Sequence, residues 1–324
     1  MTRIAVLDDY QGVALQMADW STLPKDANVH VFRDHLKDPN AVAARLRDFD
    51  IICAMRERTG FPRSILRRLP ELKLLVTTGM ANAAIDVGAA TELGIAVAGT
   101  GVLGYPTAEL TWGLIFALLR NIPAENSAVR QGKWQVSVGI GANGKRLGVI
   151  GVGRLGSQVC TVGKAFGMDV VAWSQNLTAE RAAQYGARLV SKDELLRISD
   201  IVTIQTRLSD RTRGLIGARE LALMKPTAYL VNTSRGPIVD ESALLDALRA
   251  RRIAGAGLDV FDEEPLPANH PFLSLDNALL TPHLGYVTKE TYEQFYQETV
   301  EDIRGFLSGE PVRVLNPEGL KRRQ

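Results

Sequence analysis

One histidine in this sequence has the setting of an acid/base catalyst. His283 follows the apolar run 278–281 and Pro282, and Gly285 comes two residues later. Open α/β sheets bind their ligands at the carboxyl ends of strands, and an imidazole exchanges protons readily near neutral pH. The other histidines have settings in which a packed or solvated side chain is the commoner role: His30, His35 and His270.

Two more expected strand ends are followed by charged residues. Arg235 and Gly236 follow the run Tyr229–Asn232, and Glu264 stands in a Glu-Glu-Pro run just past Gly257–Phe261. Each charge alone would usually be a surface residue. An arginine beside a glycine at the ligand-binding end of a sheet is a candidate for anion binding, because its guanidinium can hold a carboxylate through two parallel hydrogen bonds.

The segment Gly151-Val-Gly153-Arg-Leu-Gly156 has the spacing of a dinucleotide-binding loop. It stands between an expected strand, Leu147–Ile150, and an expected helix, Ser157–Phe166, as that motif requires. The first glycine permits a tight turn, the second lets the backbone approach a pyrophosphate, and the third lets the helix pack on the strand. We expect a nicotinamide dinucleotide here, with its phosphates at the helix N-terminus; a glycine-rich turn without a ligand is the alternative.

The residue that would decide between NAD and NADP is a serine. Ser174 follows the expected strand Val170–Trp173, where an NAD site has a carboxylate for the ribose diol. No acidic residue stands there to repel a 2′-phosphate, and no Arg or Lys stands directly beside it to attract one. Arg181 lies a turn or more into the next helix. The expected cofactor is therefore NAD or NADP, with the preference left open.

Alternation of short apolar runs with helical patterns predicts parallel sheets built from βαβ units. The first series of expected strands is Ile4–Leu7, Val29–Phe32, Ile51–Ala54, Leu74–Thr78 and Ile95–Ala98. The second series is Leu147–Ile150, Val170–Trp173, Ile201–Gln205, Tyr229–Asn232, Gly257–Phe261 and Leu279–Thr281. Expected helices include Ala41–Arg47, Ser64–Leu69, Ala108–Arg120 with Pro123 at or just beyond its end, and one opened by a capping box of Ser191 and Glu194.

A long helical pattern at Lys289–Leu307 has no strand partner in the second series, and we expect it to cross back to the first domain. The fold class is therefore α/β, with two doubly wound parallel-sheet domains. We expect residues 1–99 plus 289–324 to form one domain and residues 100–288 to form the other.

Composition narrows the functional class. The 324 residues include 38 Lys and Arg against 36 Asp and Glu, a net charge of +2, which argues against a dedicated nucleic-acid binder. Only Cys53 and Cys160 occur, so neither a disulfide scaffold nor a cysteine-rich zinc site is expected, and we assign no metal. The N-terminus is not a signal peptide, and the longest apolar stretch, Leu110–Leu119, is too short for a membrane span. We expect a cytoplasmic protein.

The sequence resembles the D-isomer-specific 2-hydroxyacid dehydrogenase family over nearly its whole length. The segments that carry the resemblance occur in the family's order and spacing: Gly151–Gly156, Asn232–Asp240, Gly257–Pro265 and Thr281–Gly285. The resemblance implies a flavodoxin-like substrate domain, a Rossmann-like cofactor domain and an active-site cleft between them. It also implies a homodimer, with the helix near Ala108–Arg120 and the segment around Trp134 in the dimerising region.

The resemblance also implies roles for individual residues. Arg235 would hold the carboxylate and carbonyl oxygen of a 2-keto acid, and His283 would be the acid/base, assisted by Glu264. The backbone amides of Arg154 and Leu155 would face the pyrophosphate. Further positions match residues that line the cofactor: Thr206, Thr212, Thr233, Asp259 and Gly285.

The resemblance places the substrate-binding wall in the first domain. The loop Gly79-Met80-Ala81 matches the strand end whose amides receive the substrate carboxylate, although family members often have more glycine there. Arg56 and Arg58 would stand at the opposite wall, where they could recognise an acidic tail, although a surface charge is the commoner role for at least one of them. Tyr286 replaces a small residue and could close the pocket. These departures leave the substrate undefined.

Three functional classes compete on this evidence. An NAD(P)-dependent oxidoreductase acting between a 2-keto acid and a D-2-hydroxy acid comes first. Formate dehydrogenase-like relatives would be expected to have Gln in place of Glu264, and phosphoglycerate or phosphite dehydrogenase-like activities come lower. The alternative from another class is a dinucleotide-sensing, corepressor-like interaction protein. A serine or cysteine hydrolase fails, because no G-x-S-x-G elbow occurs.

Overall fold

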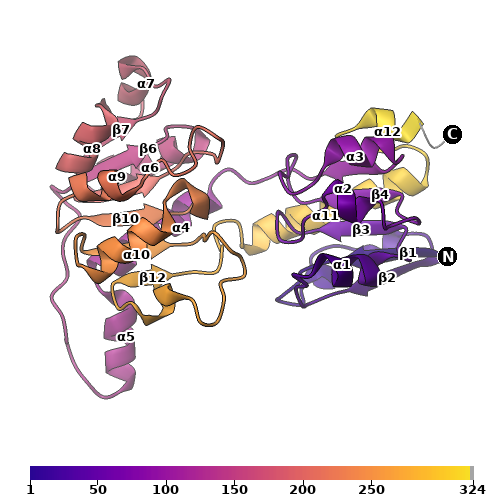
Figure 1. Ribbon diagram of the computed structural model, residues 1–324, viewed down its shortest axis with the longest axis horizontal. Coiled ribbons are helices and arrows are strands. Elements are labelled where there is room, and N and C mark those ends of the chain that lie inside the picture. The colour runs from indigo at the N-terminus through magenta and orange to yellow at the C-terminus, as the bar shows by residue number, and fades with distance from the viewer. Residues whose placement is uncertain (322–324) are drawn as a thin grey trace. The chain divides into compact units, whose positions relative to one another are not determined.

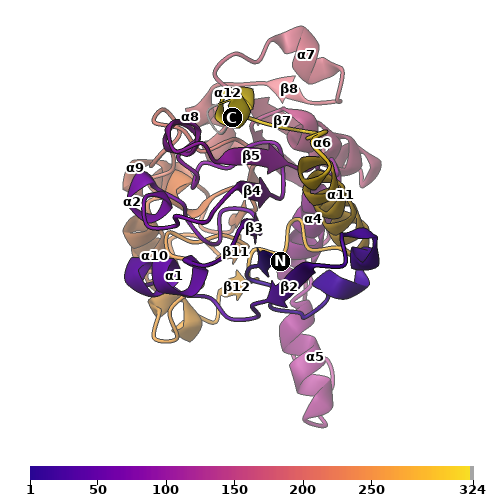
Figure 2. The same cartoon turned by 90° about the vertical axis from the view of Figure 1, so that its right-hand side faces the viewer.

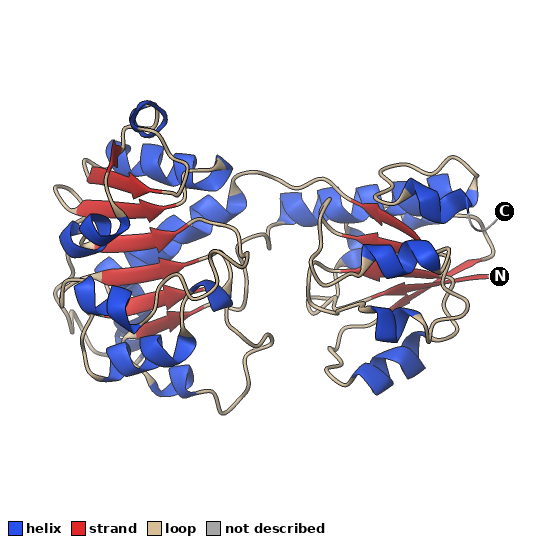
Figure 3. Cartoon of the chain, turned by 45° about the horizontal axis from the view of Figure 1, so that its top comes forward, coloured by secondary structure: helices blue, strands red, loops and turns tan. Residues whose placement is uncertain are grey.

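The computed structural model describes residues 1–321, and its backbone divides into two compact units. Within the described residues, the first comprises 1–103 and 288–321, and the second comprises Gly104–Val287. Each unit is a parallel sheet with helices on both of its faces (Figure 3). The expected α/β fold class with two doubly wound sheets is confirmed.

Among the described residues of the first unit, five strands form a sheet in the order β2-β1-β3-β4-β5 (Figure 1). The strands are β1 Thr2–Val6, β2 Ala27–Val31, β3 Ile51–Ala54, β4 Leu74–Thr77 and β5 Ala96–Gly99. The helices are α1 Pro39–Leu46, α2 Arg63–Leu66, α3 Val87–Glu92, α11 Lys289–Leu307 and α12 Pro317–Lys321, with short 3₁₀ turns at Ala14–Gln16 and Trp20–Thr22. This order has its switch point between β1 and β3.

The described part of the second unit holds a seven-stranded sheet in the order β12-β11-β10-β9-β6-β7-β8. The strands are β6 Arg146–Ile150, β7 Asp169–Trp173, β8 Arg188–Leu189, β9 Ile201–Ile204, β10 Tyr229–Asn232, β11 Gly255–Leu258 and β12 Ala278–Leu280. The helices are α4 Pro106–Leu119, α5 Ile122–Arg130, α6 Arg154–Ala165, α7 Ala179–Ala183, α8 Lys192–Ile198, α9 Ala218–Leu223 and α10 Glu241–Arg249, with 3₁₀ turns at Gly236–Ile238 and Pro271–Ser274.

The predicted elements lie close to the observed ones. Two strands, Ile51–Ala54 and Tyr229–Asn232, and the helix Lys289–Leu307 have the predicted bounds, and most other elements differ by one or two residues at an end. The strand predicted at Gly257–Phe261 is displaced, because its pairing with β10 begins at Gly255 and ends at Leu258. Asp259 therefore lies just beyond the strand end.

The helix α5 was not predicted, and one predicted cap is incomplete. Pro123 lies just beyond the end of α4, as predicted, and it also stands in the first turn of α5, where a missing amide hydrogen costs nothing. Asn121, with a φ of 49°, makes the turn between α4 and α5. The capping box is half present: the Ser191 hydroxyl accepts from the Glu194 amide at 3.1 Å, but the Glu194 carboxylate contacts Arg188 at 3.3 Å.

Buried apolar residues cover both faces of the second sheet. One core cluster joins the sheet to α8, α9 and α10, and another joins it to α4 and α6. Half of α4 is buried in its own unit, where it packs on β10, β11 and α6. The helix α5, in contrast, projects from the rest of the unit in both views (Figures 1 and 2). In the first unit, α11 packs on β4 and β5.

Candidate functional site

A histidine–glutamate pair lies beyond the carboxyl ends of β11 and β12. The Nδ1 atom of His283 lies 2.6 Å from Oε2 of Glu264, and the other oxygen of that carboxylate accepts a hydrogen bond from the Phe261 amide at 2.9 Å. The His283 side chain keeps 20% of its surface exposed. The Tyr286 ring meets the imidazole edge to face, with 5.4 Å between ring centroids. This pair can hold one imidazole nitrogen and leave Nε2 for proton transfer.

The backbone around His283 is bound to Asp259. His283 has a φ of 54°, in the left-handed region, and its amide donates to the Asp259 carbonyl at 2.8 Å. The Asp259 carboxylate is fully buried and accepts from the Thr281 hydroxyl at 2.6 Å and from the Leu284 and Gly285 amides at 2.7 and 2.9 Å. Burial raises the pKa of the Asp259 carboxyl, while the bonds from Thr281 and Leu284 act to lower it.

Arg235 begins the turn that follows β10. Its Nη1 donates to the Ser234 carbonyl at 2.7 Å, and its own carbonyl accepts from the Asn232 amide side chain at 2.9 Å. The next residue, Gly236, packs against the Phe261 backbone so closely that a Cβ would collide with it. This contact brings the segment after β10 against the segment after β11, which carries Glu264. Arg235, Glu264 and His283 thus all lie at the carboxyl edge of one sheet.

The glycine loop has the shape that a dinucleotide requires. Gly151 has a φ of 99°, and a Cβ there would lie 2.7 Å from the Gln205 carbonyl. A Cβ on Gly156 would collide with the Gly151 carbonyl oxygen, so this position also needs glycine. Gly153, the N-cap of α6, faces open space and has no side-chain cap. Arg154 and Leu155 follow as the first residues of α6.

The other predicted cofactor residues have varied settings. Thr233 is buried, and its hydroxyl lies 2.8 Å from that of Thr111 and 3.2 Å from Nε2 of Gln205. The Thr212 hydroxyl donates to the Arg207 carbonyl at 2.6 Å, so it holds its own loop together. Two more predicted positions lie directly beyond strands, Thr206 after β9 and Ser174 after β7.

The predicted substrate loop lies in the first unit, after β4. Gly79 has a φ of 95°, and a Cβ there would collide with the Arg56 guanidinium. The Arg56 amide donates to the Thr78 hydroxyl at 2.8 Å, and its Nη1 donates to the Thr78 carbonyl at 2.9 Å. The Gly79 amide already donates to the Thr100 hydroxyl at 2.9 Å. The next two residues of the loop, Met80 and Ala81, are exposed.

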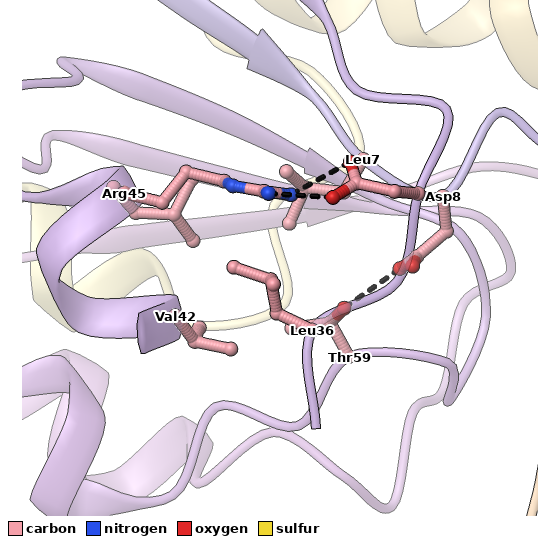
Figure 4. Close-up of a pocket in the computed structure, with 8 residues that line it drawn as sticks. Leu7, Asp8, Leu36, Val42, Arg45 and Thr59 are labelled. Atoms are coloured by element: carbon pink, nitrogen blue, oxygen red, sulfur yellow. Dashed lines mark hydrogen bonds and ion pairs between the residues drawn. The ribbon is translucent and has the colours of Figure 1, made fainter. Parts of the chain in front are cut away.

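A small cavity lies elsewhere in the first unit, beside the end of β1 (Figure 4). Asp8 is buried there and binds the Thr59 hydroxyl at 2.7 Å and His35 Nδ1 at 3.0 Å. An ion pair between Arg45 and Asp34 closes another side (Figure 4). The cavity measures about 10 Å³, which is the space that one water needs. It is too small for a substrate or a coenzyme.

Sequence reasoning gave no role to Thr281, Gln205 or Thr111. Thr281 stands two residues before His283, and Gln205 lies between the glycine loop and Thr233. A hydroxyl next to a candidate histidine was the available signal for Thr281. Nothing in the sequence indicates that Thr111, on α4, meets Thr233 on another element.

Two doubly wound sheets, with a dinucleotide loop and an acid/base pair on one of them, define a nucleotide-dependent α/β enzyme. The sequence pattern of the D-isomer specific 2-hydroxyacid dehydrogenase, NAD binding domain, matches residues 112–285. A glyoxylate reductase of Aeropyrum pernix is 43% identical over 271 residues, which cover 80% of this chain and 81% of that protein. A hydroxypyruvate reductase of Blautia hydrogenotrophica is 31% identical, with coverage of 97% and 99%.

A solved structure of an oxidoreductase from Ralstonia solanacearum is similar over the whole chain. It has a TM-score of 0.93 and 37% identity, and the match covers 99% of this chain and 98% of that one. This chain belongs to the D-isomer specific 2-hydroxyacid dehydrogenase family. It is an oxidoreductase with a nicotinamide dinucleotide as its coenzyme. No helix within residues 1–321 is long and apolar enough to cross a membrane.

Proposed function

We propose that this enzyme interconverts a 2-keto acid and a D-2-hydroxy acid, with His283 as the acid/base. The observation that carries the proposal is the 2.6 Å contact between His283 Nδ1 and Glu264 Oε2. A carboxylate on Nδ1 fixes the orientation of the ring. The ring then presents Nε2 as the atom that gives a proton to a substrate carbonyl oxygen, or removes one from a hydroxyl.

The other residues of the proposed site bind and orient the substrate. We assign to Arg235 the substrate carboxylate and carbonyl oxygen, which a guanidinium can hold through two parallel hydrogen bonds. Developing negative charge on the carbonyl oxygen strengthens those bonds in the transition state. When bound, the coenzyme supplies or accepts the hydride. The Gly151–Gly156 loop would hold its diphosphate.

In the first unit, we assign substrate contacts to the loop after β4. The amides of Met80 and Ala81 would bind the substrate carboxylate, since that of Gly79 is engaged with Thr100. The Arg56 guanidinium lies over the same loop, bound to the Thr78 carbonyl. It adds positive charge where an anionic substrate would approach. We assign to Tyr286 a role in closing the pocket, from its contact with the His283 ring.

The test is an absorbance assay of coenzyme oxidation. NADH and NADPH are run in parallel against glyoxylate, hydroxypyruvate, pyruvate, and branched and aromatic 2-keto acids. We expect turnover with at least one of them, and the product's configuration is then determined on a chiral column. Tight coenzyme binding by calorimetry without turnover on any keto acid would contradict the proposal and favour a dinucleotide sensor.

We also propose a homodimer formed through α5 and residues 131–141. This segment exposes apolar side chains that nothing in its own unit covers, with Trp134 76% and Val138 95% exposed. A hollow of about 530 Å³ lies beside them, lined by Gln135, Ser137 and Val138 among others. An exposed apolar patch of this kind marks an association surface. We assign α4, which the sequence placed in the dimerising region, a smaller part of this dimer interface than α5 and residues 131–141. Half of the residues of α4 are buried within its own unit.

Sedimentation velocity tests the dimer directly. We expect the wild type to sediment as a dimer and the double variant Trp134→Asp/Val138→Asp to sediment as a folded monomer. Leu93→Asp, which changes an exposed apolar residue of the first unit, is the matched control and should leave the dimer intact. A wild type that remains monomeric at all concentrations would contradict this proposal.

A further inference from the structure

The backbone of His283 needs support from outside its own loop. A φ of 54° places this residue in the left-handed region, which residues with a Cβ adopt only where the surrounding structure fixes them. Glu264 and Tyr286 contact the imidazole ring, and contacts to the ring do not by themselves set the backbone φ. The loop 281–285 must therefore be fixed by something else.

Asp259 supplies the fixed point. Its amide donates to the Asn232 carbonyl on β10 at 3.0 Å, so its backbone is tied to the sheet. Its carbonyl accepts from the His283 amide, and its carboxylate accepts from Thr281, Leu284 and Gly285. Four hydrogen bonds from one short loop thus end on a single residue that is fully buried.

Three donors to the Asp259 carboxylate are described. The Thr281 hydroxyl is a side-chain donor, and the Leu284 and Gly285 donors are backbone amides. Its Oγ1–Oδ1 distance of 2.6 Å is that of a short hydrogen bond. It also occupies one side of Oδ1, which turns the carboxylate so that the same atom meets the Leu284 amide. Removal of this hydroxyl leaves the carboxylate held to the loop by the Leu284 and Gly285 amides alone.

We propose that Thr281 is a positioning residue for His283 and that it acts by orienting the buried carboxylate of Asp259. The inference rests on the proposed function of His283. Asp259 and Glu264 follow the same strand, β11, so one segment holds the histidine at two points, Asp259 at the backbone and Glu264 at the ring. Thr281 sets the first point and touches neither the ring nor the glycine loop in the contacts described here.

Kinetics of two variants of Thr281 test the proposal. Thr281→Val keeps the side-chain shape and removes the donor, and Thr281→Ser keeps the donor. Because a misplacement of about 1 Å can cost about 100-fold in rate, we expect the valine variant to lose about 10- to 100-fold in kcat, with the coenzyme Kd unchanged. The serine variant should restore at least a third of the wild-type kcat.

Ser199→Ala is the matched control. It removes a fully buried hydroxyl of the same unit, which donates to the Leu195 carbonyl at 2.7 Å at the opposite end of the sheet. We expect a similar fall in melting temperature to that of Thr281→Val, and no loss of kcat at a temperature well below melting. If Thr281→Val behaves as this control does, or if serine fails to rescue it, the proposal is overturned.

A second measurement needs neither turnover nor coenzyme. Nitrogen-15 NMR of the coenzyme-free enzyme reports the Nδ1–H of His283 bound to Glu264, assigned by its loss in His283→Ala. We expect this signal to broaden or shift upfield in Thr281→Val and to persist in Thr281→Ser and Ser199→Ala. An unchanged signal in Thr281→Val overturns the positioning role. Absence of wild-type turnover on every 2-keto acid instead overturns the proposed function, which separates the two failures.

Discussion

His283 Nδ1 lies 2.6 Å from Glu264 Oε2 on a residue whose φ is 54°. The first value describes a ring held by a carboxylate, and the second describes a backbone held in an unusual conformation. Both constraints come from the segment that follows β11, because Asp259 binds the backbone and Glu264 binds the ring. A histidine fixed in this way is suited to repeated proton transfer at one atom.

Removal of the imidazole should abolish most of the activity. We expect His283→Ala to lower kcat about 10²- to 10⁴-fold, the usual contribution of a general acid/base, with coenzyme affinity near that of the wild type. His270→Ala is the control, since His270 pairs with Glu241 at 2.9 Å in the same unit and has no proposed catalytic role. Steady-state kinetics and calorimetry provide the measurement. Full activity in His283→Ala would remove this residue from the mechanism.

The carboxylate of Glu264 should be needed to hold the imidazole in place. Glu264→Gln keeps an oxygen that can accept from the Phe261 amide but replaces the oxygen that binds His283 Nδ1. Because a misplaced catalytic group can cost about 100-fold in rate, we expect kcat to fall about 10- to 100-fold, with the coenzyme Kd unchanged. The neighbouring Glu263→Gln should keep the wild-type kcat. A wild-type kcat in Glu264→Gln would reduce Glu264 to a structural role.

Ser174 should control the choice of coenzyme. A carboxylate directly after β7 would repel the 2′-phosphate of NADP and bind the ribose diol of NAD. We therefore expect Ser174→Asp to lower the ratio of kcat/KM for NADPH to that for NADH by about tenfold or more. Gln184→Glu, which adds the same charge at the far end of α7, should not change the ratio. A constant ratio in Ser174→Asp would place the ribose elsewhere.

A buried carboxyl in the first unit should make stability depend on pH. Burial raises the pKa of Asp302 from 3.8 to about 7, although Arg313 Nε lies 2.9 Å from it and acts in the opposite direction. The folded chain thus keeps a proton that the unfolded chain releases above its lower pKa. The stabilisation from this group is complete below about pH 4 and is lost as the pH rises to about 7.

Asp302→Asn removes that titration. As the pH rises from 4.5 to 7.5, we expect the urea midpoint of the wild type to decrease relative to that of Asp302→Asn. Asp246→Asn, which changes an exposed carboxylate, should show the same decrease as the wild type. Equal pH dependence in wild type and Asp302→Asn would show that Asp302 does not hold the proton.

The sequence predicts strands and helices well where burial requires a regular pattern of apolar residues. β3, β6 and β9 are buried apolar runs, and such runs are read reliably in parallel sheets. β8 escaped notice because it has two residues, Arg188 and Leu189, and lies at an edge of its sheet. α5 escaped because a proline can end one helix or begin the next, and only the backbone at Asn121 decides which.

The candidate site divides in the same way. The loop at Gly151–Gly156 could be predicted from the spacing of its glycines. Its geometry leaves no room for a side chain at Gly151 and Gly156, so only glycine fits at these two positions. The partner of a side-chain hydrogen bond, in contrast, cannot be predicted from residue types and their spacing. Nothing in the order of residues states that the Asp259 carboxylate faces Thr281 and the 284–285 amides, since those contacts join the ends of β11 and β12.

The C-terminal segment completes the first unit. Beyond α11, the Leu315 amide donates to the Val97 carbonyl at 2.7 Å, and the Asn316 side chain binds the backbone of Val97 and Ile95. A ribosome makes this segment after the whole of the second unit, which is one continuous stretch that ends at Val287. The second unit can therefore fold during translation before the first unit is complete. Nascent chains stalled before Thr288 would have a complete coenzyme-binding sheet and an incomplete first unit.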